Sequence, residues 1–211
     1  MKKFMLLLLG LAAATLSPAA GTRVFVLSSV GDVDPALVDQ VRARLEQDSG
    51  AVVRLAPPLP LEPGQSLEAI GRAAEKTLGK DDFAIIVLTR PTDEQPQGVC
   101  LPQFRFAVLN VARLEVGADP AQLVRRTGQE GVRVMAMLLG LSQCPFPLCV
   151  LVGYQNVEDL DHMSQNYCPP CQDRFTRLAN EAGIRLVEPA EDAPAEPPLA
   201  VESAEEPDAA E

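Results

Sequence analysis

Four cysteines near the C-terminal end are the residues best suited to chemistry. They form two close pairs, Cys144 with Cys149 and Cys168 with Cys171. Two such pairs separated by a loop are typical of a structural zinc site with four sulfur ligands. We expect one zinc ion on these four thiolates, because disulfides within each pair would close loops too short to stabilise the fold much.

Two other uses of these cysteines stay open at the level of sequence. Four cysteines allow three disulfide pairings, and an oxidising compartment favours disulfides. The segment Cys168-Pro-Pro-Cys171 also has the spacing of a thiol–disulfide exchange motif that opens a helix. Its place near the end of the fold argues against a thioredoxin, where this motif follows an early strand and much of the fold comes after it.

The cysteines directly follow a helical segment, and the two together resemble the archaemetzincin family of zinc metallopeptidases. That family carries the pattern H-E-x-x-H-x-x-G-x3-C, then x4-C-x-M, a loop and C-x-x-C. The family's glycine and its four structural cysteines match Gly140, Cys144, Cys149, Cys168 and Cys171. The resemblance covers roughly residues 22–186, and it implies a metzincin-like fold with a structural zinc site.

The same comparison implies that the catalytic residues of the family are absent. Arg133 and Met137 stand at the first two histidine positions, Val134 at the general-base glutamate and Gln143 at the third histidine. Leu151 replaces the methionine that lies beneath the family's catalytic metal. A catalytic zinc needs about three protein ligands and a base that activates water, which these side chains do not supply.

The two remaining candidate residues do not restore such a site. His162 is the single histidine of the chain, so three histidines cannot gather elsewhere, and we expect it to be solvated in a polar loop. Cys100 is expected to be a small buried apolar residue, with an intermolecular bridge as the alternative. We therefore expect no catalytic residues and a pseudopeptidase that acts by binding. The alternatives are a zinc metallopeptidase with an unforeseen site and a thiol–disulfide protein.

The helix of the lost catalytic motif suggests what occupies the emptied cleft. Arg133 and Met137 are four residues apart, so they share one helix face, which points into the cleft in a metzincin. One hypothesis is that Arg133 accepts a carboxylate or a peptide end there. The other is that Met137 fills the space as a core residue while Arg133 reaches water.

The ends of the chain differ from its middle in composition. Residues 1–20 have a basic start, a short apolar stretch and small residues at the end, as in a secretory signal peptide. Residues 188–211 hold nine acidic residues and no Lys or Arg, within a net charge of −11, and we expect this tail to be disordered. The sequence therefore predicts one archaemetzincin-like domain over residues 21–187 in a secreted or periplasmic protein.

The charge also bears on partners. A nucleic-acid-binding protein needs a basic face, so we expect no nucleic-acid partner, and no membrane contact once the signal is removed. A peptide or protein in the vacated cleft is the expected partner.

The pattern along the domain predicts an α/β (α+β) fold, with helices packed on a mixed twisted sheet and a zinc-knotted C-terminal subdomain. Helix-start signals stand at Asp34-Pro35, Ser66 and Asp119-Pro120. The last of these opens a long helix that we expect to reach Leu141. The expected strands are 23–28, 51–55, 83–89 and about 104–111.

Overall fold

The computed structural model describes residues 21–187, except 62–63 and 92–94. The expected signal peptide (1–20) and acidic tail (188–211) lie outside the described residues. The strands are β1 (Val24–Val30), β2 (Val53–Leu55), β3 (Asp82–Thr89), β4 (Gly98–Leu101) and β5 (Phe106–Asn110). The α-helices are α1 (Pro35–Ser49), α2 (Leu67–Glu75), α3 (Val111–Leu114), α4 (Pro120–Leu138) and α5 (Pro169–Glu181). Two short 3-10 helices are η1 (Pro102–Phe104) and η2 (Val157–Asp161).

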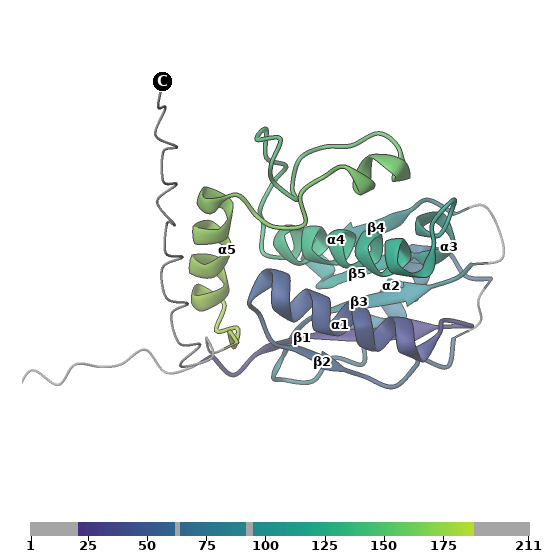
Figure 1. The fold of residues 1–211 in the computed structure, drawn as a ribbon. Helices are drawn as coiled ribbons and strands as arrows, with labels where there is room; N and C mark the ends of the chain where they lie inside the picture. Colours follow the sequence, from purple (N-terminus) through teal and green to yellow (C-terminus); the bar gives the residue numbers. More distant parts are fainter. Residues whose placement is uncertain (1–20, 62–63, 92–94, 188–211) are drawn as a thin grey trace, which may run out of the picture.

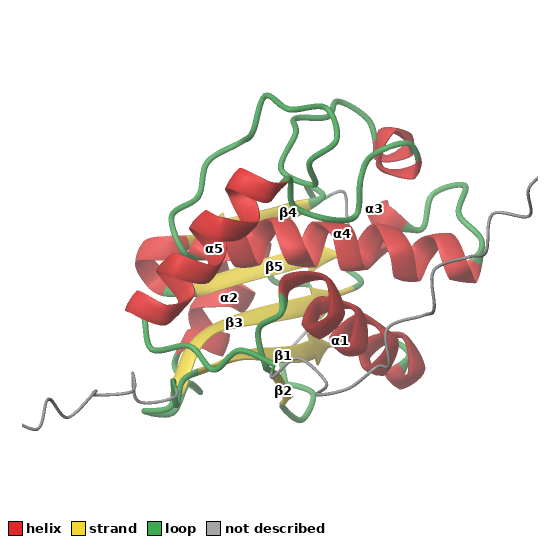
Figure 2. Ribbon diagram, turned by 60° about the vertical axis from the view of Figure 1, so that its left-hand side comes forward, coloured by secondary structure: helices red, strands yellow, loops and turns green. Residues whose placement is uncertain are grey.

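One five-stranded sheet has the strand order β2-β1-β3-β5-β4 (Figure 1). The pairs β1–β2, β1–β3 and β3–β5 are parallel, whereas β4 runs antiparallel to β5 and forms an edge of the sheet. Figure 2 shows α1 and α4 on one face of the sheet and α2 on the other. The mixed sheet with packed helices confirms the predicted fold class.

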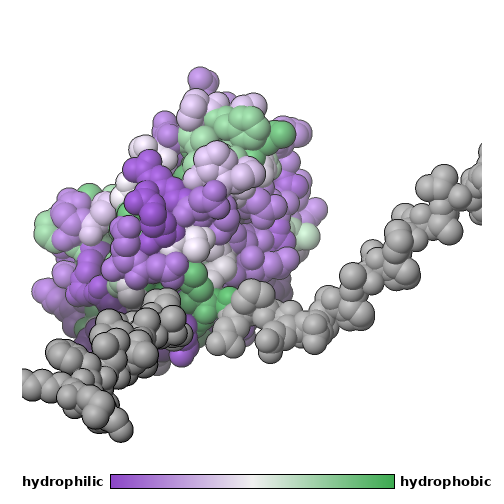
Figure 3. All heavy atoms as spheres, turned by 90° about the vertical axis from the view of Figure 1, so that its left-hand side faces the viewer, coloured by the Kyte–Doolittle hydropathy of each residue, from purple (hydrophilic) through white to green (hydrophobic). Residues whose placement is uncertain are grey.

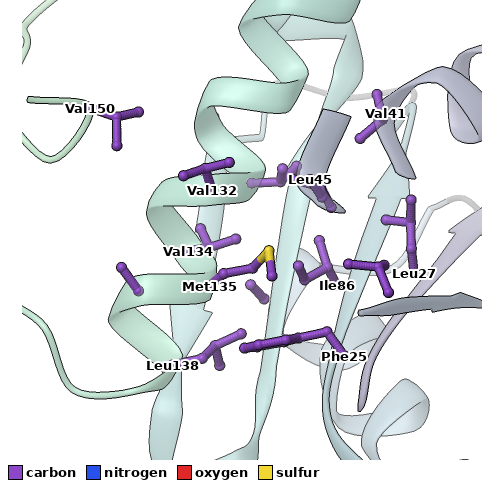
Figure 4. Packing of buried hydrophobic residues seen from close by; sticks show 14 of the residues in the cluster. Phe25, Leu27, Val41, Leu45, Ile86, Val132, Val134, Met135, Leu138 and Val150 are labelled. Atoms are coloured by element: carbon purple, nitrogen blue, oxygen red, sulfur yellow. The ribbon is translucent and has the colours of Figure 1, made fainter. Parts of the chain in front are cut away.

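The core is divided by the sheet into two layers, because successive strand residues point to opposite faces. In β3, Ile86 and Leu88 join the cluster under α1 and α4, and Ile85 and Val87 join the cluster under α2. In Figure 4, side chains of α4, including Met135 and Leu138, face residues of α1 and the sheet. Val150 lies on the other side of α4, on the long loop that leads to α5.

The predicted starts of the helices are confirmed. The Asp34 and Ser66 side chains accept hydrogen bonds from the first turns of α1 and α2. Asp119 and Gln122 form a reciprocal capping box at the start of α4. These caps satisfy backbone N–H groups that have no partner within the helix.

Two predicted boundaries were wrong, and one strand was not predicted. The single strand expected over 104–111 is instead η1, β5 and α3, because Arg105 takes a left-handed conformation (φ 54°) and Asn110 caps α3. The turn-rich segment before it contains β4, whose four residues carry little strand periodicity. Helix α4 ends at Leu138 rather than Leu141, and Gly140 follows with φ 84°, a conformation that favours glycine.

No helix among the described residues has the length and apolar character needed to cross a membrane.

Gly71 brings α2 close to the sheet, and this contact yields a prediction about stability. A Cβ atom at this position would lie 2.1 Å from the ring of Phe106 in β5. We expect Gly71→Ala to destabilise the protein by about 1–3 kcal/mol through overpacking, although alanine favours helix by about 1 kcal/mol. Urea unfolding measures the loss, and Phe106→Leu in the same chain should restore part of it. A stabilised single variant would contradict the close packing.

Candidate functional site

The four predicted cysteines come together in one cluster. The Sγ atoms of Cys144, Cys149, Cys168 and Cys171 all lie within 4.8 Å of one another. Cys144 and Cys168 are 3.8 Å apart at sulfur, and a tetrahedral zinc with bonds of about 2.3 Å would space its sulfurs by about 3.8 Å. All five cysteines of the chain are free. The donor set and its spacing therefore fit a zinc ion.

Separate segments position these ligands. Cys144 follows the end of α4, and Cys149 is buried in the loop beyond it. Cys168 is the residue before the first turn of α5, which begins at Pro169, and Cys171 lies within that turn. Backbone N–H groups of Phe146 and Cys168 lie 3.4 Å from the sulfurs of Cys144 and Cys149. Such donors stabilise thiolates, so the backbone already suits charged ligands.

The protonation of the thiols is uneven. Burial raises the pKa of Cys149, and burial together with its hydrogen bond to Cys168 raises that of Cys171. Burial also acts on Cys168, but hydrogen bonds from the Cys171 backbone and from the other thiols outweigh it and lower its pKa. Cys168 therefore ionises more readily than Cys149 and Cys171, and a bound cation would draw these two into the thiolate form.

A row of hydrogen-bond donors on α4 holds the loop that carries Cys149. Arg126 donates to the carboxylate of Asp161 at 2.6 and 2.9 Å. Gln129 donates to the carbonyl oxygens of Leu160 and Met163 at 3.0 and 3.2 Å. Because this loop is largely irregular, its carbonyl groups need partners from outside the loop.

Arg133 is the last donor of this row and lies where the resemblance places the first catalytic histidine. Its guanidinium donates to the carbonyl oxygens of Val150 and Val152. Its Nε lies 2.9 Å from Glu130 Oε1, and the guanidinium lies over the Tyr154 ring at 4.9 Å. With only 8 % of its surface exposed, Arg133 is a buried cation with its partners already in place.

The hypothesis that Met137 fills the space while Arg133 reaches water was wrong, and carboxylate binding by Arg133 stays a prediction. Arg133 is buried, because Glu130 lies beside its Nε and two carbonyl groups accept from Nη1. Met137 is 39 % exposed and lines the cavity described below, so it is not a core residue. Met135, two residues earlier on α4, is fully buried.

A cavity of about 240 Å³ lies between α4 and the edge strand β4. Its lining includes the polar residues Gln97, Glu130 and Tyr154. Burial raises the pKa of Glu130, while Arg133 and a hydrogen bond with Tyr154 act in the opposite direction. Burial and the Glu130 carboxylate raise the pKa of Tyr154, so its hydroxyl stays protonated, and this hydroxyl accepts a hydrogen bond from Gln97.

The other expected residues lie apart from the cysteine cluster. His162 is exposed, as predicted. Cys100 is half-buried and lines the cavity, and burial raises its pKa to about 12, so its thiol stays protonated. Val134 and Leu151 are buried, whereas Gln143 is exposed.

Sequence analysis missed Gln97, Glu130 and Tyr154. The spacing of Glu130 and Arg133, three residues apart on a helix, could have indicated their ion pair. The other two residues carried no local signal.

The outer face of α5 carries no comparable feature. Its exposed side chains include Asp173, Arg174 and Arg177, and the face of the molecule on that side is largely hydrophilic (Figure 3). Helix α5 therefore contributes Cys171, with Cys168 as its N-cap residue, and a buried apolar side.

No protein-family model matches the chain. Among curated proteins, the archaemetzincin of Thermococcus kodakarensis is 33 % identical over 85 residues, which cover 38 % of this chain and 46 % of that protein. The archaemetzincin of Pyrobaculum aerophilum is 30 % identical over 81 residues, or 38 % of this chain and 50 % of that protein. The chain spans about half the length of these relatives.

Solved structures extend the likeness to the whole domain. The archaemetzincin of Methanopyrus kandleri has a TM-score of 0.60 and 22 % identity, covering 75 % of this chain and 96 % of its own. The family resemblance is confirmed. A zinc-dependent peptidase from Methanocorpusculum labreanum also reaches 0.60, at 20 % identity and with 72 % and 99 % of the two chains covered. At these identities the structures show that the fold is archaemetzincin-like.

The comparisons and the cysteine cluster together support a zinc-metallopeptidase-like protein with a site for one structural zinc ion. In the archaemetzincin-like chain that ion would connect the end of α4 to the start of α5 through Cys144 and Cys168. Zinc bound to four thiolates is closed to substrate. A zinc ion held by the cysteine cluster would therefore support the structure rather than act on a substrate.

We expect the purified full-length chain to carry one zinc ion, measured by elemental analysis. Cys171→Ser should lose most of it, and Cys100→Ser should keep it as the matched control. Since structural zinc contributes about 10 kcal/mol or more of apparent binding free energy coupled to folding, strong chelators should unfold the segment from Cys144 to α5. Full stability without metal, together with two disulfides found by mass mapping, would contradict this expectation.

We expect Arg133→Gln to destabilise the protein by about 3–5 kcal/mol, because it leaves a buried carboxylate without its partner. Glu130→Gln should lower the free energy of unfolding less in the Arg133→Gln variant than in the unmodified chain, since the two residues interact. Arg177→Gln is the control, because its pair with Glu181 is exposed on both sides and should matter little. Additive changes in urea unfolding would show that Arg133 and Glu130 are not coupled.

Proposed function

We propose that this chain is an exported pseudopeptidase, an archaemetzincin-like protein that keeps a structural zinc site, lacks the catalytic one and acts by binding. One observation carries the proposal. Arg133, at the position that resembles the first catalytic histidine, is buried and engaged by Glu130 and two loop carbonyl groups. A guanidinium is a permanent cation that repels a metal ion.

The neighbouring residues support the same proposal. Val134 has no group that could accept a proton from water, and Met137 is a poor ligand for zinc compared with histidine. Gln143 is exposed, and the single histidine of the chain, His162, lies in the region of η2 rather than on α4. The partner we propose is a peptide or protein segment in the cavity between α4 and β4, whose volume suits one side chain or chain end.

Peptidase activity and metal content test the loss of catalysis. We expect no cleavage of a peptide library by the zinc-loaded chain, because the positioned base and the metal-activated water are both missing. Zinc should bind with a stoichiometry of one. A second bound zinc, or cleavage that copurifies with the protein and disappears in Arg133→Ala, would overturn the proposal. Glu158→Gln, at an exposed site, is the control for the variant.

Export is tested separately. Expression of the full chain in a bacterial host, followed by fractionation and N-terminal sequencing, should find the protein outside the cytoplasm with a new amino terminus near Ala20 or Gly21. An uncleaved product in the cytoplasm would remove the export part of the proposal and leave the rest intact.

A further inference from the structure

The cavity between α4 and β4 has a polarity opposite to that expected from Arg133. Among its lining residues Glu130 is the one charged side chain. Arg133 is absent from the lining, because its guanidinium turns toward the carbonyl groups of Val150 and Val152. A ligand in this cavity therefore meets a carboxylate, with the cation behind it.

Glu130 has room for another hydrogen-bond donor. A carboxylate offers about four lone-pair positions, and Arg133 and Tyr154 are the partners on the protein side. The contact from Arg133 to Oε1 is short, but it lacks the geometry of a directed hydrogen bond. A buried carboxylate with spare acceptor capacity favours a ligand that brings N–H groups, preferably charged ones.

The rest of the lining is apolar and small. Leu109, Val134 and Met137 contribute hydrocarbon or thioether surface, and the Cys100 thiol behaves as a small apolar group. At about 240 Å³, the cavity is below the range of about 300–1,000 Å³ that is usual for drug-sized ligands. Its capacity matches a short branched hydrocarbon group with one polar end.

We propose that this cavity binds a primary ammonium group attached to a short apolar group, with the ammonium on Glu130 and the apolar part against Leu109, Val134 and Met137. A free aliphatic amine and the amino terminus of a peptide that begins with an apolar residue share this chemistry. The inference rests on the proposed pseudopeptidase and gives its ligand a chemical class.

The ligand class is tested by titrating the zinc-loaded full-length chain with small probes while its amide chemical shifts are recorded. We expect 3-methylbutylamine to bind at least about tenfold more tightly than 3-methylbutanol, since a hydrogen bond to a charged group is worth about that factor or more. The affected amides should include those of Gln97, Glu130 and Tyr154. Equal affinity for the amine and the alcohol, or tighter binding of 4-methylpentanoate, would overturn the proposal.

A second titration with peptides distinguishes the two sources of the ammonium group, a free amine and a peptide amino terminus. Leu-Gly-Gly should bind and its N-acetylated form should not, if a peptide amino terminus fits the site. Binding of the amine without Leu-Gly-Gly assigns the cavity to free amines. Binding of the acetylated peptide as tightly as the free one would contradict a role for the ammonium.

Variants locate the interaction. Glu130→Gln should weaken amine binding by about tenfold or more, and Glu158→Gln, an exposed control with the same change of charge, should not alter it. Cys100→Leu adds bulk to the cavity while leaving Glu130 intact, and it should abolish binding. If Glu130→Gln fails to fold, the probe comparison and Cys100→Leu decide, and unchanged binding in Cys100→Leu would place the ligand elsewhere.

The outcomes separate this inference from the proposed function. Peptide cleavage or a second bound zinc would overturn the proposed pseudopeptidase, whether or not the amine binds. Failure of the amine series in a protein with one zinc and no peptidase activity rejects the ligand class and leaves the pseudopeptidase in place.

Discussion

The need to satisfy the backbone of one long, largely irregular loop constrains the whole C-terminal half of this protein. The loop between α4 and α5 carries Cys149, and several of its carbonyl groups take their hydrogen-bond donors from α4. Gln129 and Arg133 donate to loop carbonyl groups and Arg126 binds the Asp161 side chain, all from a single face of α4, each about one helical turn from the next. The helix that carries catalytic ligands in the resembled motif therefore acts here as a support for the loop and, through it, for the cysteine cluster.

If the catalytic metal is absent, as we propose, this use of α4 gives the fold another way to hold the helix and the loop together. A catalytic zinc also places a positive charge between a helix and a loop. The guanidinium of Arg133 supplies a positive charge in the same part of the fold, and it adds directed hydrogen bonds to Val150 and Val152. Its charge is balanced by Glu130 on the same helix, which avoids an unpaired buried cation. Such a pair is costly to break on one side alone, so Glu130 and Arg133 constrain each other's replacement.

The same pair determines the character of the cavity beside β4. Because Arg133 is drawn toward the loop, its partner Glu130 is the charged group that lines the cavity. Tyr154 and Gln97 continue the polar side, and residues of β5 and α4 supply the apolar side. Charge balance inside the core thus has a consequence for what could bind at its edge.

The sequence by itself determined which four cysteines cluster, where the helices start and the class of fold. These features depend on residue type at short spacing: cysteine pairs, capping residues before helices, and apolar periodicity. Tertiary structure alone decided the strand β4, the burial of Arg133 and the meeting of Glu130 with Tyr154 and Gln97. Gln97 and Tyr154 are 57 positions apart, so no local pattern indicates their contact. A charged residue on a helix is normally solvated. The burial of Arg133 is made favourable by the ion pair with Glu130 and by the carbonyl groups of Val150 and Val152 in a distant loop.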